Sequence, residues 1–455
     1  MNFHKANHIF FIGVAGTGMS ALAQYCKGIG KKVSGSDRYF NQNDIGETQQ
    51  MLIDYGIECF AQDASGITSS IDLIVISTAV EESNIEIQQA CLLNIPIIKR
   101  SELLNEISST KKTIAVGGTS GKSTTTAMIF DILEFSGLEP SIISGAGLIR
   151  LQEKGLIGNA FVGKGEWLVI EADESDGSIV YYKPVIGLLL NIDKDHKEIE
   201  ELFSIFQTFK NNSQKFIVNA HQKATLQFSQ NNNYDFSVAE SNVGFCATDF
   251  VQEGFEMKFN INNVPFQMKC IGAHNMENAL AAVATSALCG VGLETSAQAL
   301  KNYKGIYRRN QILGNKNDVI VIDDYAHNPA KCAAAIKGVQ PLTNKVVAWF
   351  QPHGYGPTKF LRHDFVDEIS KVLRKQDEIW MSEIFYAGGT AIKDISANDL
   401  INDLNKKNCK AFFVEDRNNF INEVKSHLEK NTVLLLMGAR DPSLADFAQQ
   451  VFEEL

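Results

Sequence analysis

The clearest chemical pattern in the chain is a glycine-rich loop between a predicted strand and a predicted helix. Residues 117–124 read GGTSGKST and follow the apolar residues 113–116. Glycines at such a junction let backbone N–H groups converge on a phosphate at the positive end of the helix. Lys122 is then expected to reach the β- and γ-phosphates of a nucleotide, and the Ser123 hydroxyl to ligate Mg²⁺. Val116 stands where the general phosphate-loop pattern has its first glycine, so this loop is one residue tighter.

Carboxylates gather at the ends of the next two apolar stretches. Residues 171–176 read EADESD, and residues 191–196 read NIDKDH. The four carboxylates of the first segment repel one another unless a cation compensates them. Mg²⁺ is the natural cation, because it takes oxygen ligands and nucleotide phosphates. Each segment alone could be a solvated acidic turn. The two segments are expected to lie beside a phosphate loop, at the carboxyl ends of parallel strands. Together they therefore predict a metal–nucleotide site.

A second glycine turn stands near the N-terminus. Residues 13–18 read GVAGTG after a short apolar stretch, and Asp37 ends the second predicted strand. This is a dinucleotide-type phosphate turn, although its glycine spacing is GxxGxG and not GxGxxG. The turn suits a nucleotide diphosphate as well as a nicotinamide cofactor, and it could also be a tight turn without a ligand.

Two segments of the last third could also carry chemistry. Residues 323–329 read DDYAHNP at the end of a predicted strand, shortly after Tyr307, Arg308 and Arg309. Adjacent carboxylates followed by histidine and proline suggest a functional loop, with a helix cap and turn as the alternative. Residues 350–357 read FQPHGYGP at another strand end, where His353 could be structural or catalytic.

Strands and helices alternate along most of the chain, which predicts parallel sheets covered by helices. The length of 455 residues suggests about three domains. The predicted fold class is α/β, with three domains in series. They are a Rossmann-like N-terminal domain (1–107), a P-loop ATPase-like central domain (108–306) and a Rossmann-like C-terminal domain (307–455). Within the central domain, residues 255–259 alternate with period two before Asn262 and Asn263, which predicts a hairpin with residues 264–270.

Composition excludes several classes of protein. Hydrophobic residues make up 44% and charged residues 21%, as in folded soluble proteins, and the formal net charge of -11 argues against a broad nucleic-acid-binding face. The apolar runs are far shorter than the ~20 residues that span a bilayer, and no export signal is evident. The eight cysteines include no CxxC pair. We therefore expect reduced thiols and a cytoplasmic protein without nucleic-acid or membrane partners.

Taken in order, these segments resemble the Mur ligases, the ATP-dependent amide-forming enzymes of bacterial cell-wall precursor synthesis. The resemblance rests on GTSGKST, EADESD, NIDKDH, the HNMENALAA stretch, YRR and DDYAHNP, and it covers essentially the whole chain. GVAGTGMSALA and VSGSD are most similar to the members that join L-alanine to UDP-N-acetylmuramate. A related group attaches the recycled L-Ala-γ-D-Glu-diaminopimelate tripeptide instead.

The resemblance implies ATP and Mg²⁺ as cofactors, and UDP-N-acetylmuramate with L-alanine, or a peptide, as substrates. The muramoyl carboxylate would attack the γ-phosphate of ATP, and the amino group would then displace phosphate from the acyl phosphate. The three domains would bind the UDP-sugar, ATP and the amino acid in that order. The implied assembly is a monomer or a homodimer.

Roles for single residues also follow from the resemblance. Lys122, Glu171 and His196 would be catalytic, and Ser123, Glu171 and His196 would bind metal. His327 and His353 would bind the amino acid. The implied ATP-binding residues are Gly118, Thr119, Ser120, Gly121, Lys122, Ser123, Thr124, Asn278, Arg309 and Asp324. The implied UDP-sugar-binding residues are Gly13, Ala15, Gly16, Thr17, Gly18, Met19, Ser20, Ser36 and Asp37.

The chain departs from the L-alanine-adding pattern at four positions. Ser120 replaces a histidine, Ser123 a threonine, Asn328 the second histidine of His-His-Pro, and Gly354 the arginine of Pro-His-Arg. Without that arginine, another group must hold the carboxylate of the incoming amino acid. The short stretch 176–184 favours L-alanine over the tripeptide. A nicotinamide-dependent oxidoreductase and a non-catalytic nucleotide-binding homologue are the alternative classes.

Overall fold

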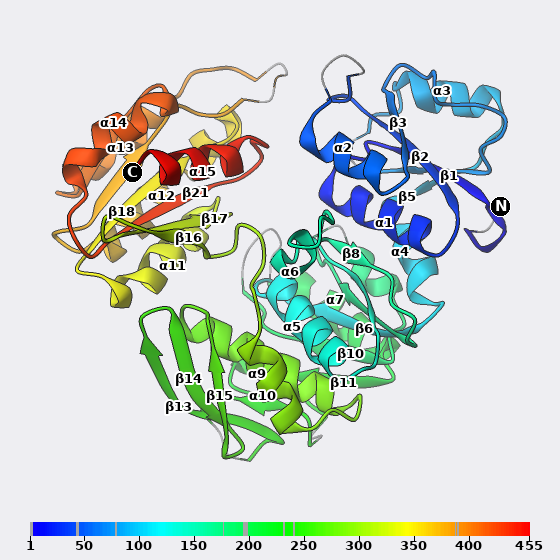
Figure 1. The fold of residues 1–455 in the computed structure, drawn as a ribbon, viewed down its shortest axis with the longest axis horizontal. Coiled ribbons are helices and arrows are strands. Elements are labelled where there is room, and N and C mark those ends of the chain that lie inside the picture. The colour runs from blue at the N-terminus through cyan, green and yellow to red at the C-terminus, as the bar shows by residue number, and fades with distance from the viewer. Residues whose placement is uncertain are drawn as a thin grey trace. The chain divides into compact units, whose positions relative to one another are not determined.

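In the computed structural model, the described residues form four sheets (Figure 1). The chain divides into two compact units, residues 1–251 with 258–269 and 273–306, and residues 307–455 with 252–257 and 270–272. No helix among the described residues is long and apolar enough to cross a membrane. The structure describes residues 3–41, 45–77, 80–175, 177–193, 199–230, 233–239, 242–386, 388 and 391–455.

The N-terminal sheet is parallel, with strand order β3-β2-β1-β4-β5. The order reverses at β1, and ligands of such sheets bind outside the carboxyl ends of the strands at that point. The predicted glycine turn follows β1 directly. The elements are β1 (His8–Ile12), α1 (Thr17–Gly28), β2 (Lys32–Asp37), α2 (Glu47–Asp54), β3 (Glu58–Ala61), β4 (Leu73–Ile76), α3 (Ile85–Leu92), β5 (Ile97–Lys99) and α4 (Arg100–Ser108).

Helices cover both faces of this sheet, which explains why β1 is apolar at nearly every position. Ile9 and Phe11 belong to a core that includes residues of α1 and α4. Phe10 and Ile12 belong to a separate core that includes Ala90 of α3. Because successive side chains of a strand point to opposite faces of the sheet, the pair Ile9 and Phe11 lies on one face and the pair Phe10 and Ile12 on the other.

The central sheet has strand order β11-β10-β6-β9-β7-β8, and only the edge strand β8 is antiparallel. The phosphate-loop strand β6 lies between β10 and β9, so the prediction that all three end side by side is confirmed. The elements are β6 (Lys112–Gly117), α5 (Lys122–Phe135), β7 (Ser141–Ile143), α6 (Ile149–Gln152), β8 (Ala160–Phe161), β9 (Trp167–Glu171), β10 (Ile186–Leu189), α7 (Ile199–Asn212), β11 (Lys215–Val218), α8 (Lys223–Leu226), α9 (Ala273–Ala287) and α10 (Leu293–Lys301).

A second, smaller sheet follows in order β12-β13-β14-β15. Its strands are β12 (Phe236–Ser237), β13 (Phe245–Glu253), β14 (Glu256–Ile261) and β15 (Val264–Met268). Asn262 and Asn263 connect β14 to β15 with φ of 47° and 67°. Two residues with positive φ match the twist of a hairpin, so the predicted hairpin is confirmed.

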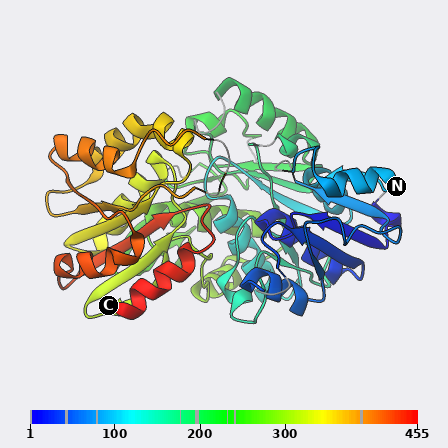
Figure 2. The ribbon, with the colours of Figure 1, turned by 90° about the horizontal axis from the view of Figure 1, so that it is seen from above.

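The C-terminal sheet has strand order β16-β17-β21-β18-β19-β20. The predicted parallel strands are confirmed, whereas the antiparallel edge strand β16 was not foreseen. Figure 2 shows helices on both faces, with α11, α12 and α13 in one core and α14 and α15 in the other. The elements are β16 (Gln311–Lys316), β17 (Val319–Asp324), α11 (Pro329–Val339), β18 (Lys345–Gln351), α12 (Tyr355–Val372), β19 (Glu378–Met381), α13 (Ala397–Lys406), β20 (Lys410–Phe413), α14 (Phe420–Val424), β21 (Thr432–Gly438) and α15 (Leu444–Glu454).

Candidate functional site

The glycine-rich loop between β6 and α5 has the backbone of a phosphate cradle. Gly118 has φ of 136° and Gly121 has φ of 83°, values that L-residues with side chains rarely adopt. A Cβ on Gly121 would lie 2.5 Å from Oδ1 of Asn278 in α9. Both positions therefore require glycine, and the loop presents its N–H groups at the N-terminus of α5.

Asn191, just beyond β10, holds this loop in place. Its Oδ1 accepts hydrogen bonds from Oγ1 of Thr119 at 2.9 Å and from the N–H of Ser120 at 2.8 Å. Its Nδ2 donates to the carbonyl of Ser120 at 3.0 Å. Sequence reasoning placed this residue near a metal–nucleotide site but did not find its role as a clamp.

Replacing Asn191 by alanine is expected to raise the KM for ATP about tenfold or more, because three hydrogen bonds that pre-organise the loop are lost. Asn191→Asp, which keeps both acceptor contacts, should have a smaller effect. ATP titrations of phosphate release measure this, with thermal unfolding as a check on folding. An unchanged KM in Asn191→Ala would show that the loop keeps its shape unaided.

Lys122, the first residue of α5, lies between the loop and the acidic segment. Its Nζ is 2.7 Å from the Gly118 carbonyl, 2.7 Å from Oε2 of Glu174 and 3.9 Å from Oδ1 of Asp173. Burial raises the pKa of Glu174 although Lys122 opposes it. Burial also acts to raise the pKa of Asp173, but Lys122 and hydrogen bonds from Ser175 bring it below its usual value. Lys122 thus has carboxylate partners that nucleotide phosphates can replace.

Glu171, the last residue of β9, has a fixed carboxylate. Its Oε1 accepts hydrogen bonds from Oγ of Ser144 at 2.8 Å and from the N–H of Gly145 at 2.6 Å. Its Oε2 and the Ser123 hydroxyl have no hydrogen-bond partner among the described residues. Sequence reasoning missed Ser144 and Gly145, which lie 27 and 26 positions earlier in the chain, respectively.

The structure describes only some of the residues predicted to bind Mg²⁺. No group of three or more His, Cys, Asp or Glu side chains among the described residues could hold a metal ion. His196 and Asp176, both in segments predicted to provide ligands, lie outside the described residues. Oxygen atoms of Glu171 and Ser123 fit Mg²⁺, which needs few protein ligands when phosphates and waters supply the others.

Asn278 is buried beside the phosphate loop. Its Oδ1 accepts a hydrogen bond from Oγ1 of Thr125 in α5 at 3.3 Å, and its Nδ2 donates to Oδ1 of Asn275 at 3.2 Å. Ser123 and Thr124 of the same helix are half-buried. The structure thus brings the predicted central ATP-binding residues together, and their contacts with nucleotide stay a prediction.

In the N-terminal sheet, Asp37 closes the glycine turn. The N–H groups of Gly13 and Val14 donate to the Ser36 carbonyl at 2.8 and 2.9 Å. Oδ2 of Asp37 accepts from the N–H of Ala15 at 3.1 Å. Gly13 has φ of 81°, and Gly16 caps α1, which begins at Thr17. The turn thus leads into the N-terminus of α1, where backbone N–H groups can bind an anion.

The other predicted UDP-sugar residues differ in their surroundings. Met19 is in the core, and the buried Ser20 hydroxyl accepts from Nδ2 of Asn159 at 2.9 Å. A Cβ on Gly18 would lie 3.1 Å from the Arg100 guanidinium, so this cation lies against the turn. Sequence reasoning missed Arg100. The binding roles of the predicted residues stay predictions.

Glu86 of α3 is fully buried behind Ser36, whose hydroxyl donates to Oε2 at 2.5 Å. Burial raises the pKa of Glu86 to about 7, although the Ser36 hydrogen bond opposes it.

A carboxyl whose folded pKa exceeds its unfolded value stabilises the fold at low pH, and this stability is lost as pH rises through the folded pKa. The wild-type free energy of unfolding should therefore fall by on the order of 2 kcal/mol between pH 5 and 8, and Glu86→Gln should remove this decrease. Denaturant unfolding of both proteins across this range tests it, and parallel pH profiles would contradict it.

In the C-terminal unit, acidic side chains at the end of β17 organise the next loop. Arg308 pairs with Asp323 through its Nε at 2.8 Å and its Nη2 at 3.1 Å. The carboxylate of Asp324 accepts from the N–H groups of Asn310 and Ala326, both at 2.7 Å. Burial raises the pKa of Asp324, and Arg309 opposes this.

His327 and His353, which follow β17 and β18, lie together with ring centroids 6.0 Å apart. Burial lowers the pKa of His327 to about 4 and also lowers that of His353. Nδ1 of His327 lies 2.9 Å from the Tyr325 carbonyl. Nδ1 of His353 is buried without a hydrogen-bond partner among the described residues. Two neutral imidazoles therefore share this strand edge at pH 7.

Comparison with known proteins identifies the family. Residues 8–112 match the catalytic domain of the Mur ligase family, residues 116–286 the Mur ligase middle domain, and residues 308–440 the Mur ligase glutamate ligase domain. UDP-N-acetylmuramate–L-alanine ligase of Dictyoglomus turgidum is 35% identical, over 96% of this chain and 94% of that protein. The chain belongs to the Mur ligase family. The enzyme of the same name from Geobacter sp. strain M21 is 34% identical, over 96% and 95%.

Solved structures agree with this assignment. UDP-N-acetylmuramate-alanine ligase of Thermotoga maritima superposes on this Mur ligase with a TM-score of 0.82 and 26% identity, covering 98% of both chains. A murein peptide ligase of Psychrobacter arcticus shares the fold, with a TM-score of 0.70 at 20% identity. This Mur ligase is thus a three-domain α/β enzyme, an ATP-dependent ligase of an acid and an amino acid. A nicotinamide-dependent oxidoreductase is no longer supported.

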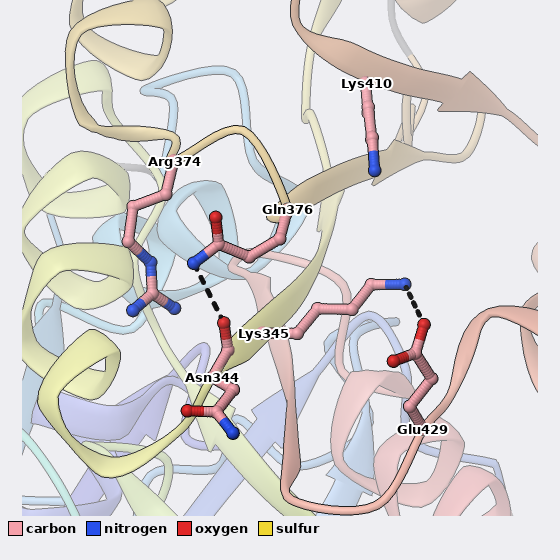
Figure 3. A pocket seen from close by; sticks show the side chains of 6 residues that line it. All are labelled: Asn344, Lys345, Arg374, Gln376, Lys410 and Glu429. Carbon is pink, nitrogen blue, oxygen red and sulfur yellow. Dashed lines mark hydrogen bonds and ion pairs between the residues drawn. The ribbon is translucent and has the colours of Figure 1, made fainter.

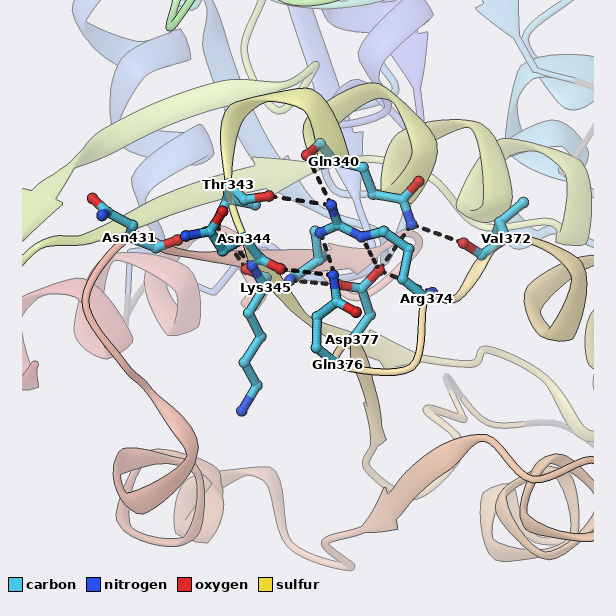
Figure 4. Close-up of polar contacts among 10 residues, drawn as sticks. Gln340, Thr343, Asn344, Lys345, Val372, Arg374, Gln376, Asp377 and Asn431 are labelled. Carbon is cyan, nitrogen blue, oxygen red and sulfur yellow. Dashed lines mark hydrogen bonds and ion pairs between the residues drawn. The ribbon is translucent and has the colours of Figure 1, made fainter.

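A pocket of about 370 Å³ lies at the amino ends of the C-terminal strands of this Mur ligase (Figure 3). Two of the cations that line it, Lys345 and Arg374, are already paired. Nζ of Lys345 is 2.8 Å from Glu378, and Arg374 forms hydrogen bonds with both carboxylate oxygens of Asp377 (Figure 4). Since α/β sheets bind ligands at the carboxyl ends, these pairs are best explained as structural.

Proposed function

We propose that this Mur ligase joins L-alanine to the carboxylate of UDP-N-acetylmuramate, with cleavage of ATP, in the synthesis of peptidoglycan precursors. The observation that carries the proposal is the similarity to UDP-N-acetylmuramate–L-alanine ligases over 96% of the chain at up to 35% identity. The murein peptide ligase neighbour, at 20% identity, supports the fold alone. A recycled tripeptide is therefore the less favoured acceptor substrate.

In the first proposed step, an oxygen of the muramoyl carboxylate forms a bond to the γ-phosphorus as the bond to ADP breaks. Lys122 exchanges Glu174 for the phosphoryl oxygens and neutralises the charge that develops on them. Backbone N–H groups of Thr119 to Ser123 surround the phosphates, and Asn191 holds the loop in the required shape.

We propose that Ser123 would hold one Mg²⁺ at this site, and that Glu171 and His196 would hold a second. The ions would supply positive charge to the phosphoryl and carboxylate oxygens when bound. Ser144 and the N–H of Gly145 keep the Glu171 carboxylate at the end of β9. The orientation of Glu171 is thus fixed before the ion arrives, which is the condition for a pre-organised ligand.

In the second proposed step, the amino nitrogen of L-alanine bonds to the acyl carbon and phosphate leaves, while the amine loses a proton. We propose that His327 and His353 lie beside this amino acid. Their lowered pKa values leave both imidazoles neutral at pH 7, so neither repels an incoming ammonium group. A neutral imidazole nitrogen can also accept a proton from the amine.

Three further features remain proposals. We keep the domain boundaries after residues 107 and 306, with UDP-sugar, ATP and amino acid bound by the three domains in order. A cytoplasmic location agrees with the use of ATP. A monomer or homodimer without nucleic-acid or membrane partners is the expected assembly.

Phosphate release tests the proposed substrate. Purified protein is mixed with ATP, Mg²⁺ and UDP-N-acetylmuramate, then titrated separately with L-alanine, glycine, L-serine and the L-Ala-γ-D-Glu-diaminopimelate tripeptide. Release that depends on L-alanine is expected. Release with the tripeptide alone would assign the enzyme to recycling, and ATP binding without release would indicate a non-catalytic homologue.

A further inference from the structure

The carboxyl ends of three neighbouring strands meet at one edge of the C-terminal sheet. Gln351 of β18 lies opposite Gly438 of β21, and Asp324 of β17 lies opposite Met437. His327, His353 and Arg440 each follow one of these strands within three residues. The register thus places an arginine at the strand edge that carries the two neutral histidines.

Arg440 is a cation without a side-chain partner in the part of the chain that the structure describes. Its side chain is exposed, and it has no hydrogen bond or ion pair with any residue that the structure describes. The adjacent Asp441 is already occupied, because Arg417 pairs with one carboxylate oxygen and the Ser443 hydroxyl donates to the other at 2.6 Å. Arg440 is therefore available for an anionic ligand.

The other arginines of this edge already contact other side chains. Arg308 is buried in its double hydrogen bond with Asp323. The Arg309 guanidinium lies 4.9 Å from the ring centroid of Tyr325, and its charge acts on Asp324. Gly354, in the loop after β18, has φ of 73° and offers no side chain. Arg440 is thus the arginine at this edge that has neither an ion pair nor an aromatic partner among the described residues.

The backbone of Arg440 has a conformation that disfavours most side chains. Its φ of 71° lies in the left-handed region, which disfavours residues with a Cβ. Glycine would be more favourable at such a position. Strained conformations of this kind are often retained where the side chain has a function.

The charge of Arg440 acts on His353, one member of the histidine pair. After burial, the charge of Arg440 is the next cause of the lowered pKa of His353. The edge therefore combines one unpaired positive charge with two neutral imidazoles. A free amino acid has a carboxylate that an arginine can bind through two parallel hydrogen bonds, and an amino group that neutral imidazoles tolerate.

We propose that Arg440 binds the carboxylate of the incoming amino acid. This assignment rests on the proposed function, because it takes the acceptor to be a free amino acid. It supplies the carboxylate-binding group that Gly354 cannot provide. Arg440 thereby contributes to the choice of an α-amino acid over an amine that lacks a carboxylate.

The test compares Arg440→Gly, Arg440→Lys and the wild-type enzyme with L-alanine and with L-alaninamide, which lacks the carboxylate. Arg440→Gly suits the left-handed backbone, so its thermal stability should not fall. Its KM for L-alanine should rise about 10- to 100-fold, whereas its KM for ATP stays within about twofold. The preference for L-alanine over the amide should fall by a similar factor, and Arg440→Lys should recover part of it.

Lys430→Ala provides the matched control, since Lys430 precedes the opposite end of β21 and its side chain is 86% exposed. It should behave as the wild-type enzyme does. An unchanged KM for L-alanine in Arg440→Gly, an equal loss with the amide, or a raised KM for ATP alone would overturn the assignment while leaving the proposed function intact. A wild-type enzyme inactive with every amino acid would contradict both.

Discussion

Lys122→Met is expected to lower kcat about a thousandfold or more and to weaken ATP binding. This corresponds to roughly 4 kcal/mol of transition-state stabilisation, the size expected when a cation is removed from developing phosphoryl charge. The loss of ATP binding and activity in this variant has a second cause. Without Lys122, the carboxylates of Asp173 and Glu174 face the phosphates unneutralised, and Glu174 is only 5% exposed.

A double variant separates the two components. Lys122→Met with Glu174→Gln removes one of the uncovered charges, so it should recover ATP affinity without recovering kcat. Lys112→Ala is the matched control, because Lys112 begins the same strand, β6, and pairs with Glu166 with its side chain 51% exposed. Steady-state phosphate release and ATP binding provide the readouts. A Lys122→Met enzyme with near-normal kcat would remove Lys122 from the proposed mechanism.

Glu171→Gln is expected to lower kcat about a hundredfold or more and to raise the Mg²⁺ concentration required for activity. Glutamine can keep the contacts that Ser144 and Gly145 make with Oε1, at 2.8 and 2.6 Å, so folding should be preserved. Glu171→Ala should lose activity and some stability. Activity titrated against Mg²⁺, with thermal unfolding alongside, distinguishes these effects.

Two further variants sharpen the interpretation. Ser144→Ala should reduce activity less than Glu171→Gln, since the Gly145 N–H still holds the carboxylate. Glu166→Gln, an exposed carboxylate before β9, should change nothing. Full ligase activity in Glu171→Ala, at the Mg²⁺ concentration that the wild-type enzyme needs, would contradict a metal-binding role.

The elements that position the site could be predicted because their patterns are local. The loop after β6 combines an apolar strand, two glycines in left-handed conformations and a helix, all within one short segment. The hairpin at Asn262 and Asn263 was predictable for the same reason. The carboxyl ends of β6, β9 and β10 could be placed together because parallel sheets align their strand ends.

Contacts between residues that lie far apart in the chain could not be predicted from the sequence. Asn191 clamps a loop 71 positions earlier, and Ser144 fixes a carboxylate 27 positions later. Such pairs have no local signature. The burial of Glu86 and the unpaired state of Arg440 likewise depend on neighbours supplied by other strands and helices. The role of His196 stays a prediction, since it lies outside the described residues.

The most direct test of the central claim follows an oxygen atom. UDP-N-acetylmuramate with ¹⁸O in both carboxylate oxygens is incubated with the enzyme, ATP, Mg²⁺ and L-alanine, and the released phosphate is analysed by mass spectrometry. Attack of the carboxylate on the γ-phosphate predicts one ¹⁸O atom in each phosphate and one in the new amide, only when L-alanine is present. Phosphate without ¹⁸O, or no amide product, would contradict an ATP-dependent L-alanine ligase that acts through an acyl phosphate.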